Sequence, residues 1–118
     1  AQYVRTMRRK LVETLIAAEE RVTLAEYIGR TTNIEMARNF LRAIEATYER
    51  LVDMPGIGVS RGYLNPELSG LRMVSIPRFP NHLIFYVATE TTVEIIRVLH
   101  GARNLETIFD PKEDESIG

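Results

Sequence analysis

The sequence contains no cysteine, only two lysines and no long hydrophobic run. Without cysteine the chain cannot form a disulfide, use a thiol nucleophile or build a cysteine-based zinc site. No stretch approaches the ~18 apolar residues of a membrane-spanning helix, and the first residues lack the apolar segment of a signal peptide. We therefore expect a cytoplasmic protein that has no membrane association.

Common catalytic and metal-binding motifs are missing as well. The sequence has no glycine-rich phosphate loop, no G-x-S-x-G elbow and no H-E-x-x-H helix. It has two histidines and no cysteine, a poor supply of ligands for a dedicated metal site. We expect neither a metal nor a cofactor.

The residues that are present suit one folded domain. The chain has 118 residues, of which 45% are hydrophobic, within the usual size of a single domain. Its 15 basic and 16 acidic residues nearly cancel, so sequence-specific DNA binding by this chain is not expected. Arginine dominates the basic residues, and guanidinium groups pair well with carboxylates and phosphates.

Hydrophobic spacing predicts a strand followed by two helices. A short edge strand is expected near Lys10–Thr14, and helices near 15–29 and 33–53. Gly29 is the expected end of the first helix, and Thr32 with Glu35 the expected capping box of the second. Apolar stripes define the expected buried faces: Leu15, Ala18, Val22, Ala25 and Ile28, then Ile34, Ala37, Phe40, Leu41, Ile44, Tyr48 and Leu51.

A loop over 55–70, rich in glycine and proline, separates these helices from three predicted strands. The strands are Leu71–Ile76, His82–Ala88 and Val93–His100. This order predicts an α+β fold, with an antiparallel helical hairpin packed on an antiparallel meander. Alternation makes both faces of the last two strands apolar, so the face away from the hairpin needs a cover. Either a partner or a short C-terminal helical turn with Leu105, Ile108 and Phe109 would provide it.

Four polar residues are expected at one end of the sheet: Arg78, His82, His100 and Arg103. With Ala88 opposite Thr92 in a simple hairpin, His82 would lie across from Val98. Such a cluster suits a phosphate or an acidic group, although residues at strand ends commonly just meet solvent. Arg97 shares the alternation of apolar neighbours and needs a partner, for which Glu13 and Glu67 are both open.

Three segments of the sequence resemble the ParE branch of the RelE/ParE toxin superfamily. They are Ser69-Gly70-Leu71-Arg72, His82-Leu83-Ile84-Phe85-Tyr86, and the string from Val93 to Glu106 that includes Arg-Val-Leu-His-Gly-Ala-Arg. The resemblance covers residues 9–109, which we interpret as one RelE-like toxin domain. Residues 1–8 would be an extension, and 110–118 an acidic tail.

The resemblance implies the toxin of a type II toxin–antitoxin pair. Such a toxin poisons DNA gyrase, blocks replication and arrests growth, and is neutralised by direct binding of a ParD-like antitoxin. On this interpretation the chain is not itself an enzyme. Arg78, His82, His100 and Arg103 are the target-binding candidates. The antitoxin-binding candidates have no assigned core partner: Tyr27, Ile84, Tyr86, Ile96 and Val98.

Two alternatives remain open. A RelE-like mRNA endoribonuclease would use His82, His100 and Arg103 as catalytic residues. Against this, the tyrosine position of that branch is taken by Phe109, and no lysine occurs between Lys10 and Lys112. A phenyl ring cannot transfer the proton that a phenol can. The second alternative is a non-toxic, degenerate binding module.

Overall fold

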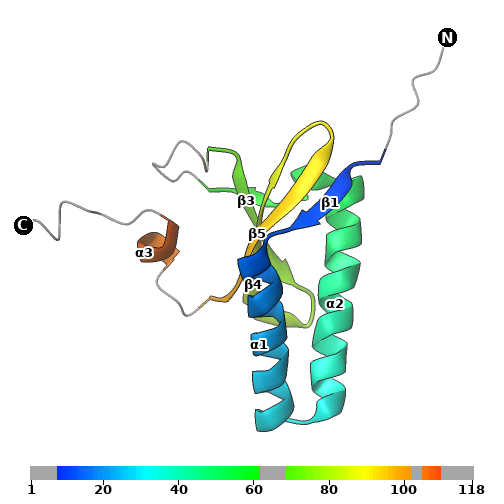
Figure 1. Ribbon diagram of the computed structural model, residues 1–118, viewed down its shortest axis with the longest axis vertical. Coiled ribbons are helices and arrows are strands. Elements are labelled where there is room, and N and C mark those ends of the chain that lie inside the picture. The colour runs from blue at the N-terminus through cyan, green and yellow to red at the C-terminus, as the bar shows by residue number, and fades with distance from the viewer. Residues whose placement is uncertain (1–7, 62–68, 102–104, 110–118) are drawn as a thin grey trace, which may run out of the picture.

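The computed structural model of the chain describes residues 8–61, 69–101 and 105–109. Five strands form one sheet in the order β1-β5-β4-β3-β2. Helices α1 and α2 pack side by side against one face, and the short helix α3 lies on the other side of the sheet (Figure 1). This is the α+β fold that the sequence predicts.

Helix α1 spans Leu15–Thr31 and α2 spans Ile34–Asp53. The Thr14 side chain caps α1 by accepting a hydrogen bond from the Ala17 N–H. The predicted capping box of α2 is wrong: the Asn33 side chain caps that helix, accepting from the Met36 N–H at 2.8 Å. Gly29 does not end α1 either. It lies within the helix, where an added Cβ would meet the Ala37 Cβ of α2 at 3.5 Å, an ordinary van der Waals contact.

The buried face of α1 differs from the predicted stripe. Ala17, Ala25 and Ile28 are buried, whereas Leu15 is 75% exposed and Val22 is also exposed. Glu20 bonds to β5 and Arg21 to β1 beneath the helix. These bonds orient α1 so that Leu15 and Val22 lie on its solvent side. The predicted face of α2 is confirmed except at the exposed Ile34.

Strand β1, Lys10–Glu13, pairs in parallel with β5, Thr92–His100. Strands β3, Leu71–Ile76, and β4, Phe79–Ala88, complete the antiparallel meander with β5. The segment after α2 is not only a loop. A 3-10 turn, η1, covers Pro55–Ile57, and the two-residue strand β2, Val59–Ser60, pairs with β3.

A β-bulge in β5 changes the predicted register. Phe85 pairs with Arg97 while Tyr86 pairs with Ile95, so β5 has one extra residue at this point. Because an extra residue reverses the alternation beyond it, Val98 faces the helices and Leu99 the opposite side. Next to the turn, Ala88 pairs with Val93 rather than Thr92, which shifts the register by one further residue.

Both faces of the sheet are covered by the chain itself. The cluster under the hairpin includes Ile76, Ile84, Tyr86, Val93, Ile95 and Val98. The second cluster contains Leu71, Phe85, Leu99 and Phe109, the last from α3, which spans Leu105–Phe109. The short C-terminal helical turn thus supplies cover for the second face.

Candidate functional site at the end of the sheet

The two histidines face each other at one end of the sheet. His82 pairs with His100 and not with Val98, because the turn sets Ala88 opposite Val93 and the bulge then adds one more residue to β5. Their ring centroids lie 4.9 Å apart, nearly perpendicular. The His82 ring also packs edge-on against Phe40 of α2, at 5.0 Å, and lies 6.3 Å from Phe79. We call these four side chains the sheet-end cluster.

The surroundings of His82 favour a neutral imidazole. Burial lowers the pKa of His82, and the neighbouring His100 lowers it further. The His82 Nδ1 atom is buried without a hydrogen-bond partner among the described residues. A neutral imidazole supports the aromatic packing, but without a positive charge it binds phosphate weakly.

Arg78 lies at the same end of the sheet, in the turn between β3 and β4. Its φ of 73° is in the left-handed region, at the second of the two turn residues after Pro77 and before Phe79. A proline followed by a residue with positive φ is the arrangement of a type II turn. The turn holds the Arg78 side chain exposed to solvent. Arg103, the fourth predicted member of this group, lies outside the described residues.

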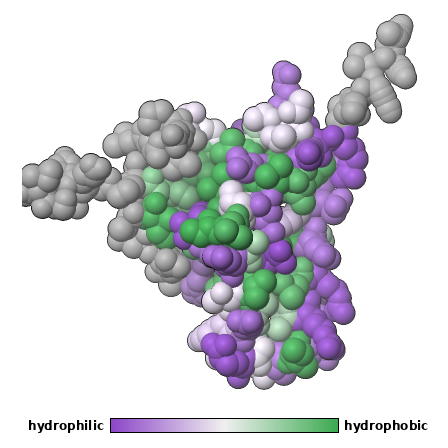
Figure 2. All heavy atoms as spheres, viewed as in Figure 1, coloured by the Kyte–Doolittle hydropathy of each residue, from purple (hydrophilic) through white to green (hydrophobic). Residues whose placement is uncertain are grey.

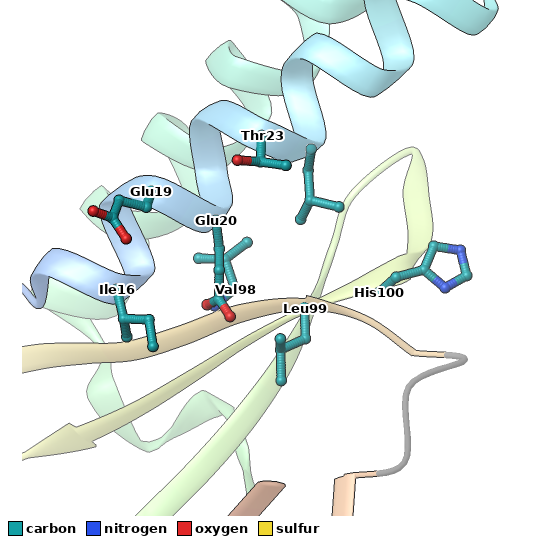
Figure 3. Close-up of a pocket in the computed structure, with 8 residues that line it drawn as sticks. Ile16, Glu19, Glu20, Thr23, Val98, Leu99 and His100 are labelled. Carbon is teal, nitrogen blue, oxygen red and sulfur yellow. The ribbon is translucent and has the colours of Figure 1, made fainter.

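A groove of about 280 Å³ runs between α1 and the end of β5, beside His100 (Figure 3). Glu20 points from α1 towards β5, while His100 points away from the helix. The Glu20 carboxylate accepts hydrogen bonds from the Arg97 guanidinium and, at 2.9 Å, from the Val98 N–H. Arg97 therefore pairs with Glu20 and not with Glu13, and Glu67 lies outside the described residues.

Glu13 belongs to a different network. It accepts two hydrogen bonds from Arg21, and a third, at 2.7 Å, from the Tyr48 hydroxyl. Hydrogen bonds from Arg21 lower the pKa of Glu13, because they stabilise its ionised form. This network joins β1 to both helices.

The antitoxin-binding candidates divide by burial. Tyr27 is 56% exposed, with the Arg30 guanidinium 6.0 Å above its ring, and Ile96 is half-buried. Ile84, Tyr86 and Val98 are fully buried under the hairpin. The expectation that these three lack core partners is wrong, because the two helices cover the face to which they point.

Tyr86 has a structural role. Its hydroxyl donates to the Pro55 carbonyl at 2.5 Å and accepts from the Gly58 N–H at 2.9 Å. A Cβ at Gly58 would lie 2.5 Å from this oxygen, so the close approach requires glycine. Tyr86 thereby fastens the segment after α2 to the sheet.

A groove of about 700 Å³ lies between the two helices. Its floor includes Ala25, Gly29 and Ala37, and its rim carries Arg30 on α1 and Arg38 on α2. We call it the hairpin groove. Small side chains on both helices leave room for another segment to approach closely.

The sequence carries no signal for the roles of Phe40 and Phe79 in the sheet-end cluster, or of Glu20 beside it. The apolar stripe had placed Phe40 in the core, but nothing in it indicated contact with His82. Glu20 lies 77 residues before Arg97, so only the tertiary fold brings them together.

Phe109, the residue at the tyrosine position of the ribonuclease branch, lies in the core, whereas the catalytic candidates His82 and His100 are half-buried and Arg103 lies outside the described residues. Phe109 is 4% exposed, and its ring centroid is 4.6 Å from that of Phe85. Within the described ranges, no group of three acidic or histidine side chains is placed to hold a metal ion. No helix in the described part of the chain has the length and hydrophobicity needed to cross a bilayer.

Comparison with known proteins gives a family and similar solved folds. Residues 13–105 match the model of the ParE toxin of the type II toxin–antitoxin system, parDE. A chain from the chromosomal ParDE toxin–antitoxin system of P. aeruginosa has a similar fold, with a TM-score of 0.65 and 17% sequence identity. The alignment covers 79% of this chain and 96% of that one. No curated protein matches the sequence significantly.

Proposed function

The chain belongs to the ParE toxin family of type II toxin–antitoxin systems, and we propose from this premise that it poisons DNA gyrase. The observation that carries the proposal is the family match, which spans residues 13–105. In this function the toxin makes and breaks no covalent bond. Gyrase cleaves the DNA, and the bound toxin makes the broken state persist, which blocks replication and arrests growth.

The sheet end is the surface that we propose contacts the target. Arg78 projects from its turn into solvent, and His100 lies beside the groove at the end of β5. His82 supports these residues through the aromatic packing of the sheet-end cluster. Arg103, three residues after His100 in the sequence, stays a candidate for the same surface.

A ribonuclease function has less support. The residue at the tyrosine position, Phe109, has no titratable group and packs in the second core cluster. His82 packs among aromatic rings, with a lowered pKa. A phenyl ring cannot transfer a proton to or from a ribose or a leaving oxygen.

We propose in addition that a ParD-like antitoxin neutralises the toxin by direct binding. The similar fold from P. aeruginosa comes from a ParDE system. On this chain the hairpin groove and the neighbouring Tyr27 offer an apolar surface with arginines at its rim. An amphipathic segment with acidic residues would fit it as a helix in a groove.

The decisive experiment adds purified chain to gyrase, supercoiled DNA and ATP. We expect loss of supercoiling and accumulation of linear DNA covalently attached to gyrase. Arg78→Glu should weaken this effect, whereas Arg30→Glu, the same charge change on the hairpin groove, should leave it intact. An inert but folded wild-type chain that still stops growth would contradict gyrase poisoning. RNA cleavage on translating ribosomes would then be tested next.

The antitoxin proposal has its own readout. Binding to the native state alone raises the melting temperature by mass action. A cognate antitoxin at saturating concentration should therefore raise it, and Arg30→Glu should reduce the rise while Arg78→Glu does not. No shift with the wild-type chain would contradict direct neutralisation, whatever the gyrase assay gives.

A further inference from the structure

Strand β1 lies at one edge of the sheet formed by the described residues. It is the first strand of the sheet order, so only β5 pairs with it among the described residues. Figure 1 shows β1 at the outside of the sheet. The N–H groups of Lys10 and Thr14 donate to Thr91 and Ile95 on the β5 side. Because peptide groups alternate in direction along a strand, those of Leu11 and Glu13 point outward.

Exposed apolar side chains surround this edge. Leu11 and Val12 are each 37% exposed, and Ile16 is 46% exposed. Figure 2 shows hydrophobic atoms gathered where α1 begins, directly after β1. A groove of about 370 Å³ adjoins the strand, lined by Leu11 and by Glu45 and Glu49 of α2. Apolar surface beside unpaired backbone groups is the usual setting for strand addition.

The charges on the strand favour an antiparallel copy of itself. Arg8, Arg9 and Lys10 stand at its start, whereas Glu13, Glu45 and Glu49 line the groove at its other end. Within the chain Glu13 already bonds to Arg21, and the Arg9 Nε donates to the Thr89 carbonyl, so the exposed groove carboxylates add to the acidic end. Basic residues on an edge strand normally discourage pairing with other strands. An antiparallel second copy reverses this effect, because the basic start of β1 in each copy then lies beside the acidic end of β1 in the other copy. A two-fold axis generates such a self-complementary contact.

We propose that two copies of this chain associate through antiparallel pairing of their β1 edges, with Leu11 on the two-fold axis. In this register the outward peptide groups of Leu11 pair with those of the second copy's Leu11. Arg9 of each copy lies across from Glu13 of the other, and near the carboxylates that line the groove. The two sheets join into one across the axis.

The dimer is expected to be weak. Five paired residues on each side, 9–13, with a few adjoining apolar side chains, form a smaller contact than the ~1,200–2,000 Å² of stable interfaces. The association should therefore depend on concentration. It requires neither gyrase nor an antitoxin, so it is tested separately from the proposed function.

Sedimentation over a concentration series tests the dimer directly. We expect a monomer–dimer equilibrium for the wild-type chain, and a dissociation constant raised about tenfold or more by Arg9→Glu, which sets like charges opposite each other. Arg38→Glu makes the same charge change on α2 and should leave the constant unchanged. A chain that stays monomeric up to millimolar concentration overturns the proposal, and so does a dimer insensitive to Arg9→Glu.

Cross-linking tests the register. Because the sequence has no native cysteine, an introduced cysteine is the only thiol that can react. Paired residues across such a ladder have Cα atoms ~5.5 Å apart, within the range that a disulfide spans. Leu11→Cys should therefore form a disulfide-linked dimer under mild oxidation. Val59→Cys, at the exposed β2 edge, should not. Cross-linking through Val59→Cys in preference to Leu11→Cys would place the interface at the β2 edge and overturn the proposal.

Discussion

The side chain of Glu20 links α1 to the part of β5 that follows the bulge. Its carboxylate accepts from the Arg97 guanidinium and from the Val98 backbone, and both members of the ion pair are less than one-fifth exposed. When one member of a buried pair is removed, the other charge stays in the interior without compensation. The stability of this contact therefore depends on keeping both partners.

The first prediction concerns this ion pair. Glu20→Gln should lower the free energy of unfolding by about 3 kcal/mol, because Arg97 loses its charge partner. Denaturant titration followed by circular dichroism measures the change. Glu19→Gln, an exposed neighbour on the same helix, should cost less than about 0.5 kcal/mol. Equal losses in the two variants would contradict the assigned role.

The second prediction follows from the lowered pKa of His82. The unfolded chain binds a proton at His82 near pH 6.5, whereas the folded chain binds it only at lower pH. Stability should therefore be full above about pH 6.5 and decline as the pH falls through the folded pKa of His82. Unfolding titrations between pH 5 and 8 measure the slope. His82→Phe should remove most of it, and an unchanged slope would assign the titration elsewhere.

At the scale of elements, the segment between α2 and β3 depends on one hydroxyl. Tyr86→Phe leaves the Gly58 N–H and the Pro55 carbonyl without their bonded partner. The expected loss is about 2 kcal/mol in the free energy of unfolding, measured by thermal and chemical denaturation. Tyr27→Phe removes a hydroxyl from an exposed ring and should change stability by less than about 0.5 kcal/mol. An unchanged free energy of unfolding in Tyr86→Phe would show that this attachment does not contribute to stability.

Most elements could be predicted from the sequence, because their signals are local. Strand β3 has its predicted bounds, and α2 ends at Asp53 as the following proline indicates. The bulge could not be predicted, because Ile95 and Ile96 are both apolar and an inserted residue leaves no gap in such a run. The cap of α2 was misassigned by one position, since Thr32 and Asn33 are both good capping residues.

The candidate site was predicted less completely than the fold. The sequence placed His82 and His100 at one end of the sheet but gave His82 the wrong partner, since the turn and the bulge each shift the register by one residue. The buried positions of Ile84 and Val98 depend on which face the helices cover, and strand alternation alone does not decide this. Glu20 was missed because its bonds to β5 depend on long-range packing.

At the scale of the whole molecule, the chain covers its own second sheet face with the five-residue helix α3. The Phe109 side chain is central to this cover, packing on Phe85. Phe109→Ala should lower the free energy of unfolding by about 3 kcal/mol and increase binding of a hydrophobic dye. Ile34→Ala, at an exposed apolar position, is the control. Unchanged stability and dye binding in Phe109→Ala would show that α3 is dispensable as a cover.

The parallel pairing of β1 with β5 has a consequence for synthesis. The first strand of the described chain bonds to a partner 82 residues later in the sequence, as the Thr14 hydroxyl and the Ile96 carbonyl do. Contacts of such long sequence separation form late and slowly. A nascent chain still lacking β5 has no partner for β1, no counter-charge for Glu20 and no strand to complete the core beneath α1. The toxin fold therefore cannot assemble step by step on the ribosome, and translation interrupted before β5 yields a chain without that fold.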